Sequence, residues 1–241
     1  MKHNWLIQRN RDRLIVFCNG WGMDDRPFTA IPSEEFDVLH IYDHRPPWTT
    51  EPLLSRIRRY TAPVLVSWSM GVWAAHHYFE KTAPIFSAAI AVNGTLCPIH
   101  SRYGIPQELF AGTMSGWSEP ARRKFYSRLC GNRAVWDNFS GQFPARDCAD
   151  QRDELAFYLE NADCINKSDS IYSHVVVGDK DRIVRTENQL SFWKTDKTTL
   201  VPGSHFLFYD YSSWDHFVHF FTAQTMNVPS QEQAENASNR S

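Results

Sequence analysis

Short apolar segments that alternate with helical segments are the feature that most constrains the fold of this chain. Residues 14–18, 38–42, 64–66 and 85–92 are apolar runs of strand length, and helical patterns occupy residues 51–60 and 70–81. The alternation resumes with a strand at 174–177, a helix at 187–193, a strand at 198–201 and a closing helix at 214–226. Apolar strands that alternate with helices are typical of a parallel sheet covered by helices on both faces. The sequence therefore predicts an α/β protein.

The alternation is interrupted between about residues 94 and 173. This stretch is helical at 106–112, 119–129 and 152–161, with irregular pieces around 141–147. We therefore predict an α/β core made of residues 1–94 and 172–226, with a helical insertion over 95–171. Residues 227–241 are polar after Pro229, and we predict that they form a disordered tail.

Charge and cysteine content exclude several classes of protein. The 241 residues carry a formal net charge of −2, which argues against a protein that coats nucleic acid. The five cysteines never occur as CxxC, which argues against a disulfide scaffold or a zinc knuckle and favours a reducing compartment. The first residues are too polar for a signal peptide, and no apolar run is long enough to span a membrane. We expect a soluble cytoplasmic protein.

One short motif places a serine between a predicted strand and a predicted helix. It reads Ser67-Trp68-Ser69-Met70-Gly71. A nucleophile on such a sharp turn projects its hydroxyl above the carboxyl ends of the strands, where open α/β sheets bind ligands. Small residues two positions before and after are needed because strand and helix come close together. A strand-helix turn without chemistry explains these five residues about equally well.

Two further loops follow late strands and carry the partners that a nucleophilic serine needs. The segment GDKDRIV, residues 178–184, offers two carboxylates, Asp179 and Asp181, although either could serve only the turn. The segment PGSHF, residues 202–206, offers His205 in a loop after the last strand. The order of serine, acid and histidine along the chain is one of the known arrangements of a catalytic triad.

A triad also needs N–H groups that stabilise an oxyanion. The N–H of Met70 follows the serine and begins the helix, which makes it the first candidate donor. The second should come from the loop after the first core strand, residues 19–22, where two glycines permit close approach and the Trp21 N–H is suitably placed. As an isolated feature, Asn-Gly would be an ordinary turn.

Taken together, the segments NGWGMD, SWSMG, GDKDRIV and PGSHF resemble the α/β-hydrolase superfamily. They resemble in particular the BioG-type esterases, which demethylate pimeloyl-acyl-carrier-protein methyl ester in biotin synthesis. The resemblance covers residues 12–94 and 172–226, and it implies an α/β-hydrolase fold with a mostly parallel sheet and a cap over the site. Carried over by position, Ser69 would be the nucleophile, His205 the general base and Asp181 the orienting acid. Trp21 and Met70 would form the oxyanion hole.

The sequence departs from the commoner pattern of the superfamily at two points. Asn19 stands before Gly20 where histidine is commoner, and Ser67 stands where glycine is commoner. BioG-type proteins also depart from the wider pattern in such ways. The resemblance implies hydrolysis through an acyl-enzyme with no cofactor, and no grouping of residues has the spacing of metal ligands.

The predicted insertion is more basic than the rest of the chain. Between residues 102 and 146 there are seven basic and three acidic residues. Four of the basic residues gather on one helical segment: Arg122, Arg123, Lys124 and Arg128. A solvated helix face would explain them, but a positive cap also suits an acidic partner such as an acyl carrier protein, the partner implied by the resemblance.

Other functions remain open at this point. A small-molecule carboxylesterase or thioesterase of the same fold would use the same residues. A non-catalytic relative that only binds a partner would have no use for Ser69, Asp181 and His205 together. The sequence thus predicts a serine esterase and favours a carrier-protein methyl ester as its substrate.

Overall fold

Seven strands form one sheet in the order β1-β3-β2-β4-β5-β6-β7 in the computed structural model, which describes residues 1–48, 50–194 and 197–223. The strands are β1 (Lys2–Ile7), β2 (Arg13–Cys18), β3 (Phe36–Tyr42), β4 (Val64–Trp68), β5 (Ala88–Val92), β6 (His174–Gly178) and β7 (Thr198–Val201). Strands β2 to β7 run parallel, and only β1 pairs antiparallel, with β3. The prediction of a mostly parallel sheet is confirmed.

Alternating side chains of the central strands fill two hydrophobic cores, one on each face of the sheet. On β2, Leu14 and Val16 belong to one core, whereas Ile15 and Phe17 belong to the other. All four are completely buried, which explains why the strand is apolar throughout rather than alternating with polar residues.

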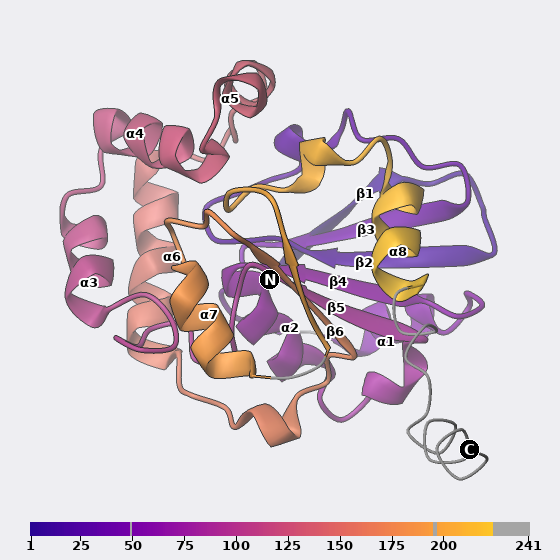
Figure 1. The fold of residues 1–241 in the computed structure, drawn as a ribbon. Coiled ribbons are helices and arrows are strands. Elements are labelled where there is room, and N and C mark those ends of the chain that lie inside the picture. The colour runs from indigo at the N-terminus through magenta and orange to yellow at the C-terminus, as the bar shows by residue number, and fades with distance from the viewer. Residues whose placement is uncertain (49, 195–196, 224–241) are drawn as a thin grey trace, which may run out of the picture.

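Helices cover both faces, as predicted (Figure 1). The first core is closed by α1 (Glu51–Ile57), α2 (Met70–Phe79) and α7 (Thr186–Trp193). The second is closed mainly by α8 (Trp214–Ala223). Four short 3₁₀ helices complete the connections: η1 (Arg26–Phe28), η2 (Ala83–Ile85), η3 (Lys167–Asp169) and η4 (Phe208–Asp210).

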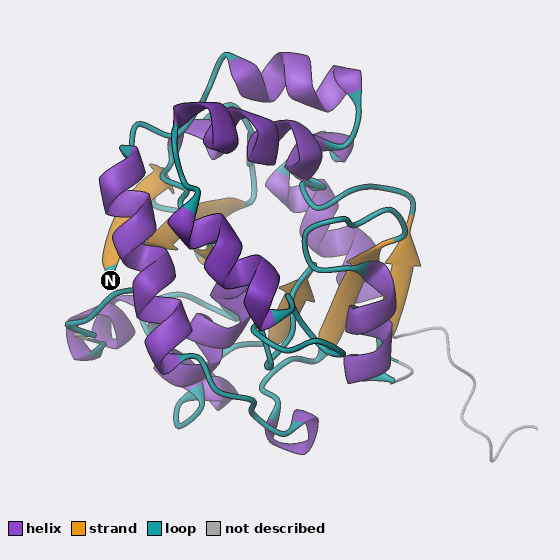
Figure 2. Cartoon of the chain, turned by 90° about the vertical axis from the view of Figure 1, so that its left-hand side faces the viewer, coloured by secondary structure: helices purple, strands orange, loops and turns teal. Residues whose placement is uncertain are grey.

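Between β5 and β6 the chain forms four consecutive helices, which we call the insertion. They are α3 (Gln107–Ser115), α4 (Glu119–Cys130), α5 (Arg133–Ser140) and α6 (Cys148–Asn161). They lie together at the left and top of Figure 1, beyond one end of the strands, and Figure 2 shows them in front of the sheet. The insertion therefore adjoins the edge of the sheet at which the parallel strands end.

One strand and one α-helix of the described residues were not predicted from the sequence, nor were the four 3₁₀ helices. Strand β1 lies at the edge of the sheet and is only partly buried, so its mixed sequence KHNWLI carries no strong apolar signal. Helix α5 is capped by the preceding Asn132, whose side chain accepts a hydrogen bond from the Val135 N–H. The end of the predicted closing helix and the predicted disordered tail, residues 224–241, lie outside the described residues.

The cysteines require a correction, because Cys97 and Cys164 form a disulfide. It joins the segment after β5 to the segment after α6, 67 residues further along the chain. The pairing gave no signal in the sequence, since it depends on two segments meeting in space. Cys18, Cys130 and Cys148 are free thiols.

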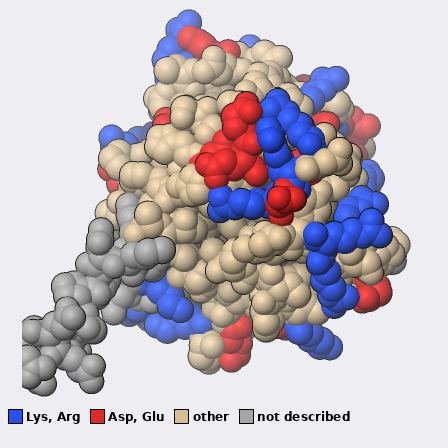
Figure 3. Space-filling view, turned by 90° about the vertical axis from the view of Figure 1, so that its right-hand side faces the viewer, with Lys and Arg blue, Asp and Glu red and all other residues tan. Residues whose placement is uncertain are grey.

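The face opposite the insertion carries charges of both signs. Figure 3 shows acidic and basic side chains next to one another on it. At the amino-terminal ends of β2 and β3, Arg9 pairs with Glu34 and Arg13 with Glu35. None of the helices in the described part of the chain is long and apolar enough to cross a membrane.

Candidate active site

Ser69 occupies a strained turn between β4 and α2. Its backbone has φ 58° and ψ −126°, a conformation that side-chain-bearing residues rarely adopt, and its N–H is held by the Val92 carbonyl at 2.9 Å. Gly71 and Gly94 allow the close packing around this turn. A Cβ on Gly71 would lie 2.2 Å from the Asn19 carbonyl oxygen, and one on Gly94 would lie 2.4 Å from the Ser69 carbonyl oxygen. The turn therefore holds the Ser69 side chain at the carboxyl end of the sheet.

The structure brings Ser69, His205 and Asp181 into one hydrogen-bonded chain. The Ser69 Oγ lies 2.9 Å from His205 Nε2, and His205 Nδ1 lies 2.7 Å from Asp181 Oδ2. Because a carboxylate only accepts, Nδ1 carries the proton and Nε2 is free to accept one from the serine. Asp179 instead accepts a hydrogen bond from the Gly203 N–H at 2.9 Å and does not contact the histidine.

Asp181 is fixed by two further donors. The Ile183 N–H donates to Oδ1 at 2.8 Å, and the Gln189 Nε2 donates to Oδ2 at 2.8 Å. The carboxylate is therefore buried with its oxygens occupied and can face the histidine in only one orientation.

The backbone of the His205 loop is held from two neighbouring strands. Asn93, at the end of β5, donates through Nδ2 to the carbonyls of Ser204 and His205, both at 2.9 Å. Trp68, at the end of β4, donates through its indole N–H to the His205 carbonyl at 2.9 Å. These bonds set the position of the imidazole relative to Ser69.

Both candidate oxyanion donors lie beside Ser69. Met70 is the first residue of α2, so its N–H has no partner within the helix. The loop of residues 19–22 approaches closely enough that a Cβ on Gly20 would lie 3.0 Å from the Ser69 Cβ. Within the described residues, neither the Trp21 N–H nor the Met70 N–H donates a hydrogen bond to another group of the protein. Both remain available to an oxyanion.

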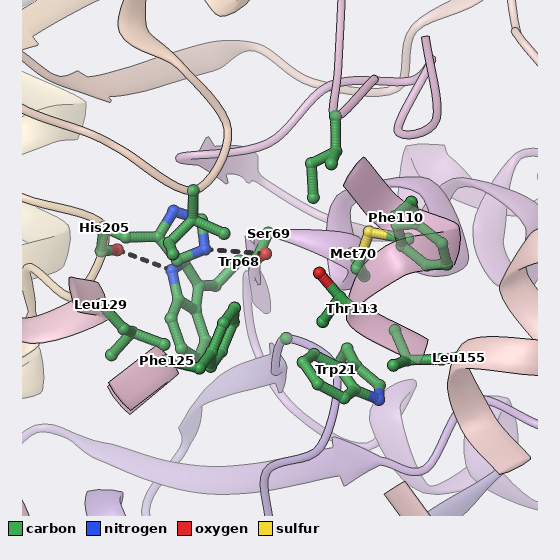
Figure 4. A pocket seen from close by; sticks show the side chains of 13 residues that line it. Trp21, Trp68, Ser69, Met70, Phe110, Thr113, Phe125, Leu129, Leu155 and His205 are labelled. Carbon is green, nitrogen blue, oxygen red and sulfur yellow. Dashed lines mark hydrogen bonds between the residues drawn. The ribbon is translucent and has the colours of Figure 1, made fainter. Parts of the chain in front are cut away.

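An apolar pocket opens at Ser69. Figure 4 shows the serine and the histidine linked at one side, with aromatic and aliphatic side chains around the remaining space. The lining residues besides Ser69 and His205 are Gly20, Trp21, Trp68, Met70, Ile105, Phe110, Thr113, Phe125, Leu129, Leu155 and Ile183. Six of them, Ile105 to Leu155, lie between β5 and β6, so the insertion and the segment that leads into it supply one side of the pocket. Such a surface suits an apolar group.

The four basic residues singled out on α4 have different surroundings. Arg122 is partly buried and is bound by Glu119 and by the Arg146 carbonyl, both within the insertion. Arg123 is exposed and lies over the ring of Trp136. The other two, Lys124 and Arg128, are exposed and line a second depression.

This second depression, which we call the cationic depression, adjoins the apolar pocket. Its four cations are Lys124, Arg128, Lys180 and Arg182, and it also contains one acid, Asp210. Phe125, Leu129, Ile183 and His205 line the apolar pocket, and the residues immediately before them line the cationic depression: Lys124, Arg128, Arg182 and Ser204. The two depressions therefore share a wall.

Sequence reasoning missed several residues that shape this site. Asn93 and Gln189 hold the histidine loop and the acid, and Lys180 and Arg182 add two cations from outside the insertion. Asn93 could have been found, because an Asn-Gly pair directly follows a strand. Gln189 had no signal in the sequence. No three His, Cys, Asp or Glu side chains gather as a metal site would require anywhere in residues 1–48, 50–194 and 197–223.

Comparison with known proteins finds a matching family and two related proteins. A family model described as pimeloyl-ACP methyl esterase BioG matches residues 1–217. An uncharacterized protein of Haemophilus influenzae is 31% identical over 206 residues, which cover 84% of this chain and 93% of that protein. A malonyl-[acyl-carrier protein] O-methyltransferase of Bacteroides fragilis is 31% identical over 198 residues, 81% of this chain. The chain spans only 40% of the length of that relative.

Two solved structures are similar to this chain in fold. The crystal structure of BioG from Haemophilus influenzae is 28% identical, with a TM-score of 0.74, and the match covers 89% of this chain and 98% of that one. A hydrolase from Oleispira antarctica has a TM-score of 0.63 at 11% identity, over 91% of this chain and 94% of that one, which shows the shared fold alone. The predicted α/β-hydrolase fold with a helical insertion is confirmed.

Proposed function

The chain belongs to the BioG family of pimeloyl-ACP methyl esterases, a family of carboxylic ester hydrolases, and we propose that Ser69, His205 and Asp181 carry its reaction. The proposed reaction hydrolyses the methyl ester of pimeloyl-acyl carrier protein to the free acid and methanol in biotin synthesis. One observation carries the proposal: the hydrogen-bonded chain from Ser69 through His205 to Asp181 opens into an apolar pocket.

The geometry supports a two-step reaction through an acyl-enzyme. As the Ser69 Oγ attacks the ester carbonyl, His205 Nε2 takes its proton and then gives it to the departing methoxide, which leaves as methanol. Water, deprotonated by the same nitrogen, attacks the acyl-enzyme and releases the carboxylic acid. Asp181 keeps the proton of the neutral imidazole on Nδ1 and stabilises the imidazolium that forms.

The proposed oxyanion donors are the N–H groups of Met70 and Trp21. The negative charge that develops on the carbonyl oxygen would accept both, and the amino-terminal end of α2 adds a favourable dipole. The Trp21 donor comes from a loop, so its direction depends on how that loop is held.

We place the carrier protein over the cationic depression. Carrier proteins present an acidic surface and hold the acyl group on a phosphodiester-linked arm, and four cations with one acid suit both groups. Because the cationic depression shares a wall with the apolar pocket, an arm whose phosphate lies among the cations could direct its acyl group toward Ser69. This assignment keeps Lys124 and Arg128 from the sequence prediction and adds Lys180 and Arg182.

One relative supports a carrier-bound methyl ester. The Bacteroides protein is named for methylation of a malonyl group on a carrier protein, and this chain matches 40% of it. A carrier-bound methyl ester is the product of such a methylation and the substrate of the reaction proposed here. We propose a cytoplasmic location as well; this rests on the biosynthetic reaction of the family and not on the cysteines, two of which form a disulfide.

The test is direct assay of the purified protein. Mass spectrometry follows loss of one methyl ester from pimeloyl-carrier-protein methyl ester, beside a short aryl ester as comparator. We expect both to be hydrolysed, with the higher kcat/KM for the carrier-bound ester at low salt. Hydrolysis of the aryl ester alone would favour a small-molecule esterase, and hydrolysis of neither by folded protein would refute the proposed function.

A further inference from the structure

A buried glutamate in the insertion contacts the loop that carries the Trp21 N–H. Glu154 lies on α6, and its side chain is completely buried. Its Oε2 accepts a hydrogen bond from the Gly22 N–H at 3.0 Å, and its Oε1 accepts one from the His44 N–H at 3.1 Å. Arg146 donates to the same carboxylate at 2.6 Å and balances its charge. Hydrogen bonds to a carboxylate are stronger than those to a neutral acceptor, so Glu154 is a firm anchor.

His44 extends this anchor to the other end of the loop. Its Nε2 lies 2.8 Å from the Asn19 carbonyl oxygen, and its Nδ1 lies 2.9 Å from the Tyr78 hydroxyl. A carbonyl only accepts, so the histidine proton is on Nε2. Burial lowers the pKa of His44, which keeps the ring neutral and lets Nδ1 accept from the tyrosine. One carboxylate therefore contacts Gly22 directly and Asn19 through the histidine.

Gln151, one turn earlier on α6, binds the same loop. Its Nε2 donates to the Gly22 carbonyl at 2.7 Å, and its backbone carbonyl accepts from the Trp21 indole N–H at 2.7 Å. Gly22 has φ +75°, and a Cβ there would lie 3.3 Å from the Gln151 Nε2, so the loop fits closely against the helix. The peptide groups on both sides of the Trp21 N–H are thus bound, while that N–H has no partner among the described residues.

We propose that Glu154 is a positioning residue, which together with Gln151 directs the Trp21 N–H toward the oxyanion of the transition state. The inference rests on the proposed function and adds to it a role for the insertion: α6 sets the geometry of a catalytic donor as well as lining the pocket. A buried ion pair by itself is weak evidence for stabilisation, because desolvation offsets the attraction. This carboxylate also binds the Gly22 N–H of the loop and the N–H of His44, so it fixes the position of the loop, which an ion pair alone would not do.

The test compares Glu154→Gln with Asp150→Asn. Both residues lie on α6 and both bind Arg146, but only Glu154 contacts the loop or His44. In Glu154→Gln the amide NH₂ replaces the oxygen that accepts either from the Gly22 N–H or from the His44 N–H, so the loop loses a direct contact at Gly22 or the support of Asn19 through His44, without a change of side-chain size. The measurements are kcat and KM on the short aryl ester, the dissociation constant of an aryl boronic acid, and the thermal midpoint. The boronic acid becomes tetrahedral when the Ser69 Oγ bonds to boron and its proton passes to His205, so it requires the oxyanion donors.

We expect Glu154→Gln to lower kcat at least about tenfold and to weaken boronic acid binding by a similar factor, with KM changed less than about twofold. Asp150→Asn should keep kcat and boronic acid binding within about twofold of wild type, even if its thermal midpoint falls. Equal losses of kcat in the two variants, or a rise of KM alone in Glu154→Gln, would overturn the inference.

A second variant covers the case in which Glu154→Gln does not fold. Gln151→Met keeps the length of the side chain and removes the donor to the Gly22 carbonyl. It should show the same joint loss of kcat and boronic acid affinity, and wild-type values in this folded variant would overturn the inference. Failure of the proposed function looks different, because the wild-type protein itself would then neither hydrolyse the aryl ester nor bind the boronic acid.

Discussion

Replacing Asp181 by asparagine tests the proposed triad with a change of a single atom. The Asp181 carboxylate accepts from the Ile183 N–H at Oδ1, and from His205 and Gln189 at Oδ2. An amide nitrogen at the Oδ1 position would face the Ile183 N–H, a backbone donor that cannot turn away. At the Oδ2 position it would face the Gln189 Nε2, which belongs to a side chain that can rotate away and which keeps the Val184 carbonyl as a second acceptor. The asparagine NH₂ should therefore face His205 Nδ1.

An NH₂ group at that position reverses the protonation of the imidazole. The histidine must accept at Nδ1, so its proton moves to Nε2, which points at Ser69. This tautomer cannot take the serine proton, and no carboxylate remains to stabilise the imidazolium. We expect kcat on a short aryl ester to fall about 10³- to 10⁴-fold, or about 4 to 5.5 kcal/mol of transition-state stabilisation, with KM nearly unchanged.

Asp179→Asn is the matched control, because it makes the same chemical change two residues away. Asp179 is exposed and binds only the Gly203 N–H, so kcat should stay within about threefold of wild type. The assay is steady-state hydrolysis of the aryl ester by variants whose circular dichroism matches wild type. An Asp181→Asn enzyme with kcat within tenfold of wild type, or an equal loss in Asp179→Asn, would refute the reasoning.

Three further outcomes are expected. Ser69→Ala should fold normally and lose about 10³-fold or more of kcat on the aryl ester, whereas Ser67→Ala should keep most of it; a folded Ser69→Ala protein with the wild-type rate would exclude Ser69 as nucleophile. Lys124→Gln combined with Arg128→Gln should raise KM for the carrier-bound ester about fivefold at low salt and leave the aryl ester unaffected, and equal changes for both substrates would contradict docking over the cationic depression. Burial lowers the pKa of His40 to about 3, so the unfolded chain binds a proton below pH 6.5 that the folded chain does not, and stability falls as the pH falls. In urea unfolding, the free energy of unfolding should drop from pH 7 to pH 5 by about 2 kcal/mol more in wild type than in His40→Gln, and parallel drops in the two proteins would show that folded His40 takes up the proton, which would refute the prediction.

Most of the core could be predicted because its signals are local. The strand at Leu14 to Cys18 is apolar at every position because both of its faces are buried, and this shows in the sequence without any partner. Strand β1 had no such signal, because an edge strand is only partly buried. Its place beside β3 follows from backbone pairing that no pattern in its six residues indicates.

The candidate triad was also within reach of the sequence, for a topological reason. Parallel strands bring the loops at their carboxyl ends to one edge of the sheet, so Ser69, Asp181 and His205 can be placed near each other from order alone. The order of the residues along the chain did not by itself decide whether Asp179 or Asp181 contacts the histidine. That choice followed from the resemblance, and in the structure Asp181 is the one that contacts the histidine.

The sequence by itself determined the elements of this protein whose information is local: buried strands, the serine turn, and the loops that follow the strands. Tertiary structure decided everything that depends on which distant segments meet. Cys97 pairs with Cys164, Gln189 binds Asp181, and Glu154 reaches across from α6 to the loop at Gly22. Cysteine, glutamine and glutamate are common in many settings, and their roles here come from partners up to 132 residues away in the chain. Such roles arise only once the chain is folded, because a hydrogen bond or disulfide depends on position in space and not on distance along the sequence.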